Sequence, residues 1–140
     1  IHCRIRSMGE KGATNTHPFT YKHGAMIHNG TLSGTNAKSN EGPSDTALFL
    51  QQFGDKLTYD VVLKQRAELE EAIGSWNKLA FLFNDGKHLI LNQDKGEWND
   101  GVWYSNTTYK RSISRITGPW SQKDVDDAWD DYHSTLNWVN

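Results

Sequence analysis

The sequence predicts a single α+β domain over residues 1–140, because amphipathic helical segments and short apolar, strand-like runs both occur and neither dominates. Helices are expected from Ser44 onward and over 59–73. Strand-like runs occupy 79–84 and 87–92, and the Asn-Asp-Gly sequence between them is typical of a β-hairpin turn, most simply a type I′ turn. A chain of 140 residues has the size of one domain, and no internal repeat or linker divides it.

The N-terminal third combines short strand-like runs with many polar residues. The runs 1–6 and 25–32 are separated by glycine-rich turns, and the polar segment 33–43 predicts a loop of the kind that borders a binding site. Ser44 suits the N-cap of the first helix. Asp45 suits its first turn, because a negative charge there interacts favourably with the positive end of the helix dipole.

The second helix, 59–73, carries an apolar stripe of Val62, Leu69 and Ile73. Gly74 is expected to end it, because glycine readily adopts the left-handed conformation that closes many helices.

The C-terminal part continues the alternation of turns and regular elements. Residues 94–100 predict a turn and 101–105 a strand. An amphipathic helix is expected over 122–137, within a Trp-rich tail at 111–140. Its aromatic stripe favours packing on a sheet, with an interaction surface as the alternative.

Composition and charge exclude several classes of protein. The 15 Lys+Arg and 17 Asp+Glu give a formal net charge of -2, so binding of nucleic acid through bulk electrostatics is not expected. No apolar run approaches the roughly 20 residues that span a bilayer, so no membrane association is expected either. One cysteine, Cys3, and no recognisable signal peptide at the start predict a cytoplasmic location.

The first run contains a candidate carboxylate-binding side chain. In an extended strand His2 and Arg4 share one face, whereas Cys3 points to the other and is expected to pack as a small apolar residue. The planar guanidinium of Arg4 matches the two oxygens of a carboxylate.

A candidate oxyanion-binding pair follows the second run. Asn29 can donate from its side-chain amide, and Gly30 lets a backbone N–H approach a ligand closely, although an Asn-Gly pair is also typical of a hairpin turn. The histidines His17, His23 and His28 have no spacing typical of a metal site, and no cofactor is expected.

Four short motifs together resemble one known family. They are His2-x-Arg4, His17-Pro18-Phe19, His28-Asn29-Gly30-Thr31 and Ser44-Asp45-Thr46. In this order they resemble the class II glutamine amidotransferase domain of the N-terminal-nucleophile (Ntn) hydrolase superfamily, over about residues 1–110. The resemblance implies a four-layer αββα sandwich and a glutaminase that hydrolyses the glutamine side-chain amide to glutamate and ammonia. A related amide is the alternative substrate.

The resemblance also implies roles for individual residues. Arg4 would bind the α-carboxylate of glutamine and Asp45 its α-amino group, while Asn29 and Gly30 would form the oxyanion hole. The two motif histidines, His17 and His28, are expected to shape the substrate pocket.

The sequence departs from the family at its start. Family members use an N-terminal cysteine well upstream of the H-x-R arginine, whereas this sequence begins almost at that motif and Cys3 has no free α-amine. The nucleophile and the first strands of the sandwich are therefore expected on an N-terminal fragment that completes the domain, and the chain as printed is expected to be inactive. The alternative is a catalytically silent binding or structural module of the same fold, for instance a viral or host-interaction protein.

Overall fold

The computed structural model describes residues 8–107. The predicted strand at 1–6, with Arg4 and Cys3, and the predicted helix at 122–137 lie outside these residues. The chain divides after Ser105, and every helix and strand below belongs to the part before it. This part is α+β with antiparallel sheets, as the sequence predicts.

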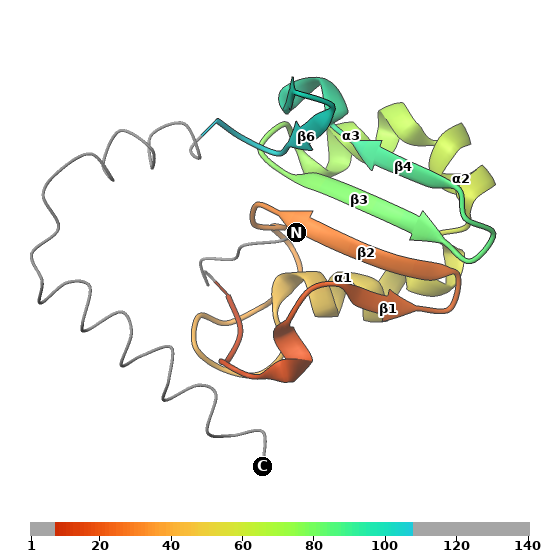
Figure 1. The fold of residues 1–140 in the computed structure, drawn as a ribbon. Coiled ribbons are helices and arrows are strands. Elements are labelled where there is room, and N and C mark those ends of the chain that lie inside the picture. The colour runs from red at the N-terminus through yellow and green to blue at the C-terminus, as the bar shows by residue number, and fades with distance from the viewer. Residues whose placement is uncertain (1–7, 108–140) are drawn as a thin grey trace, which may run out of the picture. The chain divides into compact units, whose positions relative to one another are not determined.

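The main element is a four-stranded antiparallel sheet with the strand order β1-β2-β3-β4 (Figure 1). Its strands are β1 Phe19–Tyr21, β2 Gly24–Asn29, β3 Lys78–Phe83 and β4 His88–Leu91. The sequence did not predict β1, and β2 ends at Asn29 rather than at residue 32 as expected. In the central pair His28 lies opposite Leu79, and Asn29 lies opposite Lys78.

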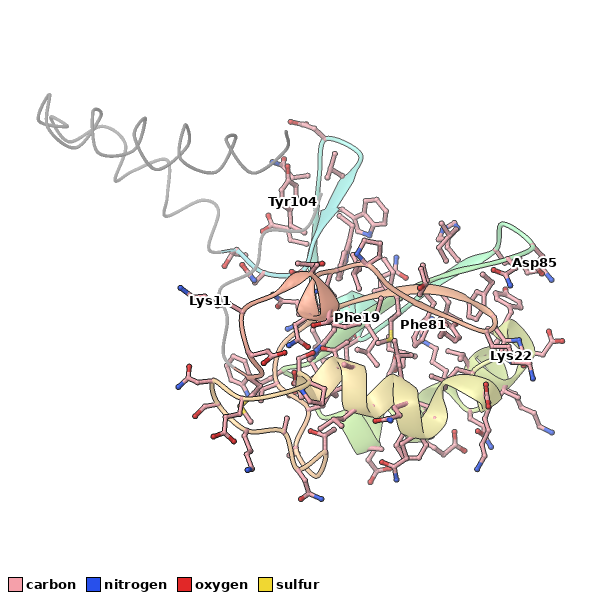
Figure 2. The ribbon with its side chains drawn as sticks, turned by 90° about the horizontal axis from the view of Figure 1, so that it is seen from below. Lys11, Phe19, Lys22, Phe81, Asp85 and Tyr104 are labelled. Carbon is pink, nitrogen blue, oxygen red and sulfur yellow. The ribbon has the colours of Figure 1, made fainter. Side chains whose placement is uncertain are left out.

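Three helices cover one face of this sheet, as the view from below in Figure 2 shows. They are α1 Asp45–Phe53, α2 Tyr59–Lys64 and α3 Arg66–Ile73. The prediction of one helix over 59–73 is wrong, because Gln65 has φ -102° and ψ 25° and separates α2 from α3. Gly74 ends α3 with φ 76°, as expected from its freedom to adopt positive φ.

The core lies between the helices and the strand residues that alternate towards them. The sheet contributes Met26, Leu79, Phe81, Phe83, Leu89 and Leu91, and the helices contribute Leu50, Val62 and Ile73. His28 occupies the same face of β2 as Met26 and is 5% exposed. A polar side chain thus interrupts the apolar face at one end of the sheet.

The opposite face of the sheet is also apolar. Strand alternation places Ala25 and Ile27 of β2, Ala80 and Leu82 of β3, and Ile90 of β4 on it. Leu82 is 56% exposed, and α1–α3 all lie on the other side. We call these five residues the second face.

The hairpin between β3 and β4 is confirmed, but its turn type differs from the prediction. The Gly86 N–H donates to the Phe83 carbonyl at 2.9 Å, and Gly86 has φ 83°, whereas Asp85 has no positive φ. A type I′ turn needs positive φ at both central residues, so this is a type I-like turn followed by a left-handed glycine. The turns at 22–23 and 84–86 lie at the same end of the sheet, where Lys22 and Asp85 are labelled in Figure 2. We call it the hairpin end.

A second, two-stranded sheet pairs β5 Glu97–Asn99 with β6 Val102–Tyr104. The predicted strand at 101–105 is therefore confirmed as β6, whereas the predicted turn at 94–100 contains a strand as well. Short 3-10 helices complete the structure at η1 Ala13–Asn15, η2 Gly54–Lys56 and η3 Gln93–Lys95. Within residues 8–107 no helix is long and apolar enough to cross a bilayer.

Candidate functional site

The end of the sheet opposite the hairpins is where β2 ends and β3 begins. Asn29, Gly30, Asn77 and Lys78 lie there, and we call it the polar end. Gly30 has φ 137°, and a Cβ at this position would lie 2.2 Å from Asn77 Oδ1 and 3.0 Å from Asn77 Cα. Glycine is required here because both the backbone conformation and the close approach of Asn77 exclude a side chain.

His28 is fixed at both of its ring nitrogens. Nε2 lies 2.9 Å from Asn77 Oδ1, and Nδ1 lies 2.8 Å from the Thr46 hydroxyl. Asn77 Nδ2 donates to the Ile73 carbonyl at 2.6 Å, which leaves Asn77 Oδ1 as an acceptor and makes His28 Nε2 the donor. With both nitrogens engaged, His28 joins β2 to α1 and to the start of β3, and it is suited to positioning rather than to proton transfer.

Asp45 is the first residue of α1. Ser44 precedes it as the N-cap and accepts a hydrogen bond from the Ala47 N–H, as the sequence predicts. The helix dipole favours a carboxylate at this position. Asp45 therefore lies at the N-terminus of α1, next to the polar end.

The two carboxylate oxygens of Asp45 are not used equally. Oδ2 accepts from the Leu32 N–H at 2.7 Å and lies 4.0 Å from His28 Nδ1. Oδ1 accepts no hydrogen bond from any residue that the structure describes, although Asp45 is only 3% exposed. A carboxylate oxygen with unused acceptor capacity, on a side chain that its other oxygen holds in place, is suited to binding a cation.

Unused donors occur at the same strand end. Neither the Asn29 side-chain amide nor the Gly30 N–H donates a hydrogen bond within residues 8–107. Asn29 is partly buried and Gly30 is exposed, so both donors are accessible, and two consecutive accessible donors at one strand end suit the binding of a ligand oxygen.

The loop 33–43 is tied to the same region by Asn15. Its Nδ2 donates to the carbonyls of Glu10 and Gly42, and its Oδ1 accepts from the Ser44 N–H at 2.7 Å. Asn15 is 2% exposed. This side chain therefore anchors the start of α1, and with it Asp45, against the loop.

The structure brings together four of the six residues that the sequence assigns to a site. His28, Asn29, Gly30 and Asp45 meet at the polar end. The ring of His17 contacts Phe19 edge-on, with 4.8 Å between centroids. Arg4 lies outside the described residues. No group of three or more metal-ligating side chains occurs among those described.

Three residues of the polar end were not predicted: Thr46, Asn77 and Lys78. Thr46 and Asn77 position His28, and Lys78 lies opposite Asn29 with 8% exposure. Burial lowers the pKa of Lys78, because it disfavours the ammonium form. The signal in the sequence is weak: a polar Asn-Lys pair directly before the apolar run at 79–83.

No protein-family model, curated protein or solved structure matches this chain. The geometry of the polar end and the motifs in the sequence are the features of this chain that bear on its function.

Proposed function

We propose that the polar end is the glutamine-binding site of a glutaminase domain of class II amidotransferase type. The complete domain would hydrolyse the side-chain amide of glutamine to glutamate and ammonia. One observation carries the proposal: an unused carboxylate acceptor on Asp45 and unused donors on Asn29 and Gly30 occur around one strand end.

These groups match the substrate in charge and in hydrogen-bonding capacity. Asp45 Oδ1 is suited to the α-ammonium of glutamine, and Arg4 would hold its α-carboxylate. The Asn29 amide and the Gly30 N–H would donate to the oxygen of the tetrahedral intermediate. A single donor of this kind contributes about 3 kcal/mol to transition-state stabilisation. His28 would hold β2 and α1 in register, and His17 would line the pocket.

The chemical step needs a thiolate with a neighbouring base. In the proposed reaction an N-terminal cysteine attacks the amide carbon, its α-amine passes the thiol proton to the departing ammonia, and water hydrolyses the thioester. Cys3, inside the chain, has no such amine, so we assign the nucleophile to an N-terminal segment that completes the domain.

The second face supports the finer fold assignment within this proposal. In a four-layer αββα sandwich, the face of a sheet that points away from its helices packs against a second sheet. Ala25, Ile27, Ala80, Leu82 and Ile90 provide an apolar surface of that kind. We assign the second sheet to the remaining strands of the complete domain.

The test is the binding of L-glutamine to the 140-residue chain, measured by isothermal titration calorimetry. The Asp45→Asn variant keeps an oxygen for the Leu32 N–H but loses the negative charge, so it should fold and bind at least about tenfold more weakly. The matched control is Asp55→Asn, which changes an exposed carboxylate and should bind like the wild type.

Two results would contradict the proposal: no binding of L-glutamine by the wild type, or equal binding by the Asp45→Asn variant. Hydrolysis is tested separately, by ammonia release from the protein purified from its natural source. Binding without ammonia release there would establish the silent binding module instead.

A further inference from the structure

We infer that Lys78 is a further ligand-binding residue of this site, and that its ammonium group contacts the γ-carboxylate of bound glutamate beside the Asn29 amide. The inference rests on the proposed function, because it assigns a role within the same site. It adds an anion-binding position that selects the product over the substrate.

Lys78 lies beside the proposed oxyanion-binding side chain, Asn29. Asn29 and Lys78 lie directly opposite each other in the β2–β3 pair. Their Cβ atoms are therefore about 5 Å apart and on the same face. The preceding and following residues, His28 and Leu79, face the helices, so Asn29 and Lys78 face away from them.

The ammonium group of Lys78 also has unused hydrogen-bonding capacity. Lys78 is 8% exposed, and its Nζ donates one hydrogen bond, at 3.3 Å, to the Trp76 carbonyl. No carboxylate of the described residues forms an ion pair with it. An ammonium group has three donors, so two remain unused in a nearly buried position.

The energetic consequence follows from burial. A buried ammonium without an anion is unfavourable, and the lowered pKa of Lys78 reflects this cost. An anion bound beside it would offset the cost. Because the Asn29 amide is the adjacent unused donor, the two side chains together suit one carboxylate or one oxyanion.

Lys87 provides the matched control at the hairpin end. It is exposed, its Nζ lies 2.7 Å from Asp85 Oδ2, and this hydrogen bond raises its pKa. Its charge is already paired, so it has no need of a further anion.

The first experiment compares dissociation constants for L-glutamate and L-glutamine in the wild type and in the Lys78→Met and Lys87→Met variants. Methionine retains most of the buried stem and removes the charge. Lys78→Met should weaken L-glutamate binding about tenfold or more and L-glutamine binding less than about threefold. Lys87→Met should change neither. Equal weakening of both ligands, or of neither, by Lys78→Met would overturn the inference.

The second experiment separates this inference from the proposed function and requires no variant to fold. Lysine side-chain Cε and Nζ signals of the wild-type chain are followed by NMR during titration with L-glutamate and with sodium acetate, a carboxylate without an α-amino group. A saturable shift of the Lys78 signal with acetate, larger than that of Lys87, supports the anion site even if neither amino acid binds. A Lys78 signal that responds to neither ligand overturns it.

Discussion

The two ends of the four-stranded sheet are built from the same antiparallel ladder but differ in how their polar groups are satisfied. At the hairpin end Asn84 donates to the Lys22 carbonyl, and Lys87 pairs with Asp85 in solvent. At the polar end Asp45 and Lys78 are nearly buried, and each retains unused hydrogen-bonding capacity among the described residues. Figure 2 shows the labelled residues of the hairpin end, Lys22 and Asp85, away from the loop that carries Lys11.

The difference indicates that the hairpin end serves stability alone, whereas the polar end is suited to binding a ligand. Leaving polar groups buried and unsatisfied costs free energy, so folded proteins satisfy nearly all of them, and exceptions concentrate where ligands bind. Among the described residues, Lys87 at the hairpin end pairs with a carboxylate, whereas at the polar end Lys78 and Asp45 are nearly buried and keep donors or acceptors that no described residue uses. Substitutions at matched residues of the two ends should therefore differ in their effect on stability.

The largest difference in the free energy of unfolding is expected between alanine substitutions of two glycines, Gly30 and Gly86. Gly30→Ala would force a Cβ against Asn77, whose side chain is held by two hydrogen bonds, and should lower the free energy of unfolding by about 3 kcal/mol. In Gly86→Ala the new Cβ has no atom within 4 Å, so the free energy of unfolding should fall only by the cost of positive φ for alanine, about 1 kcal/mol. Urea unfolding followed by Trp fluorescence measures both. Equal losses would show that the polar end is no more tightly packed than the hairpin end.

A smaller difference in the free energy of unfolding is expected between alanine substitutions of two asparagines, Asn77 and Asn84. Asn77→Ala leaves His28 Nε2 and the Ile73 carbonyl without their partners in a buried position, so it should cost about 2–3 kcal/mol. Asn84→Ala removes an exposed side-chain hydrogen bond and should cost less than about 1 kcal/mol. The same urea experiment applies. If Asn77→Ala costs no more than Asn84→Ala, the His28–Asn77 pair does not hold β2 and β3 together.

The pH dependence of stability compares Lys78 at the polar end with Tyr21 near the hairpin end. The folded-state pKa of Lys78 is below 10.5, so the unfolded chain binds more protons between these values, and stability should rise with pH there. Tyr21, beside the hairpin end, has its pKa raised by burial to about 12. The folded chain therefore binds more protons above pH 10, and stability should fall as pH rises from there towards 12.

Two substitutions separate these contributions. Lys78→Met should flatten the rise of the melting temperature below pH 10, and Tyr21→Phe should reduce its fall above pH 10. Melting temperatures measured by circular dichroism across this range check both. A rise that persists unchanged in Lys78→Met would mean that Lys78 has the same pKa in the folded and unfolded chain.

The sequence predicts the parts of the fold that local chemistry determines. The start of α1 follows from Ser44 and Asp45, the end of α3 from Gly74, and the β3–β4 hairpin from the Asn-Asp-Gly turn. These features depend on capping and on positive φ, which neighbouring residues alone decide. The three-residue strand β1 was missed because it exists through pairing with β2 rather than through its own pattern. The interruption of the helical segment at Gln65 likewise has no proline or glycine to mark it.

Some residues of the candidate site could likewise be identified from the sequence, and others could not. Asn29, Gly30 and Asp45 could be selected from motifs, because each carries its chemistry in its own side chain or backbone. Asn77 could not, since its function depends on a contact with His28 that spans 49 positions in the sequence. Lys78 could not either, because its distinguishing property is burial without an anion, which only the folded chain determines.

An NMR titration of the ¹⁵N-labelled chain with L-glutamine, observing the Gly30 backbone and Asn29 side-chain amides, tests the glutamine site most directly. We expect saturable shifts of both signals, no shift of the Gly86 amide at the hairpin end, and at least about tenfold more L-glutamine needed for the same shifts in Asp45→Asn. Unchanged Gly30 and Asn29 signals at millimolar L-glutamine, or equal shifts at both ends of the sheet, would contradict it.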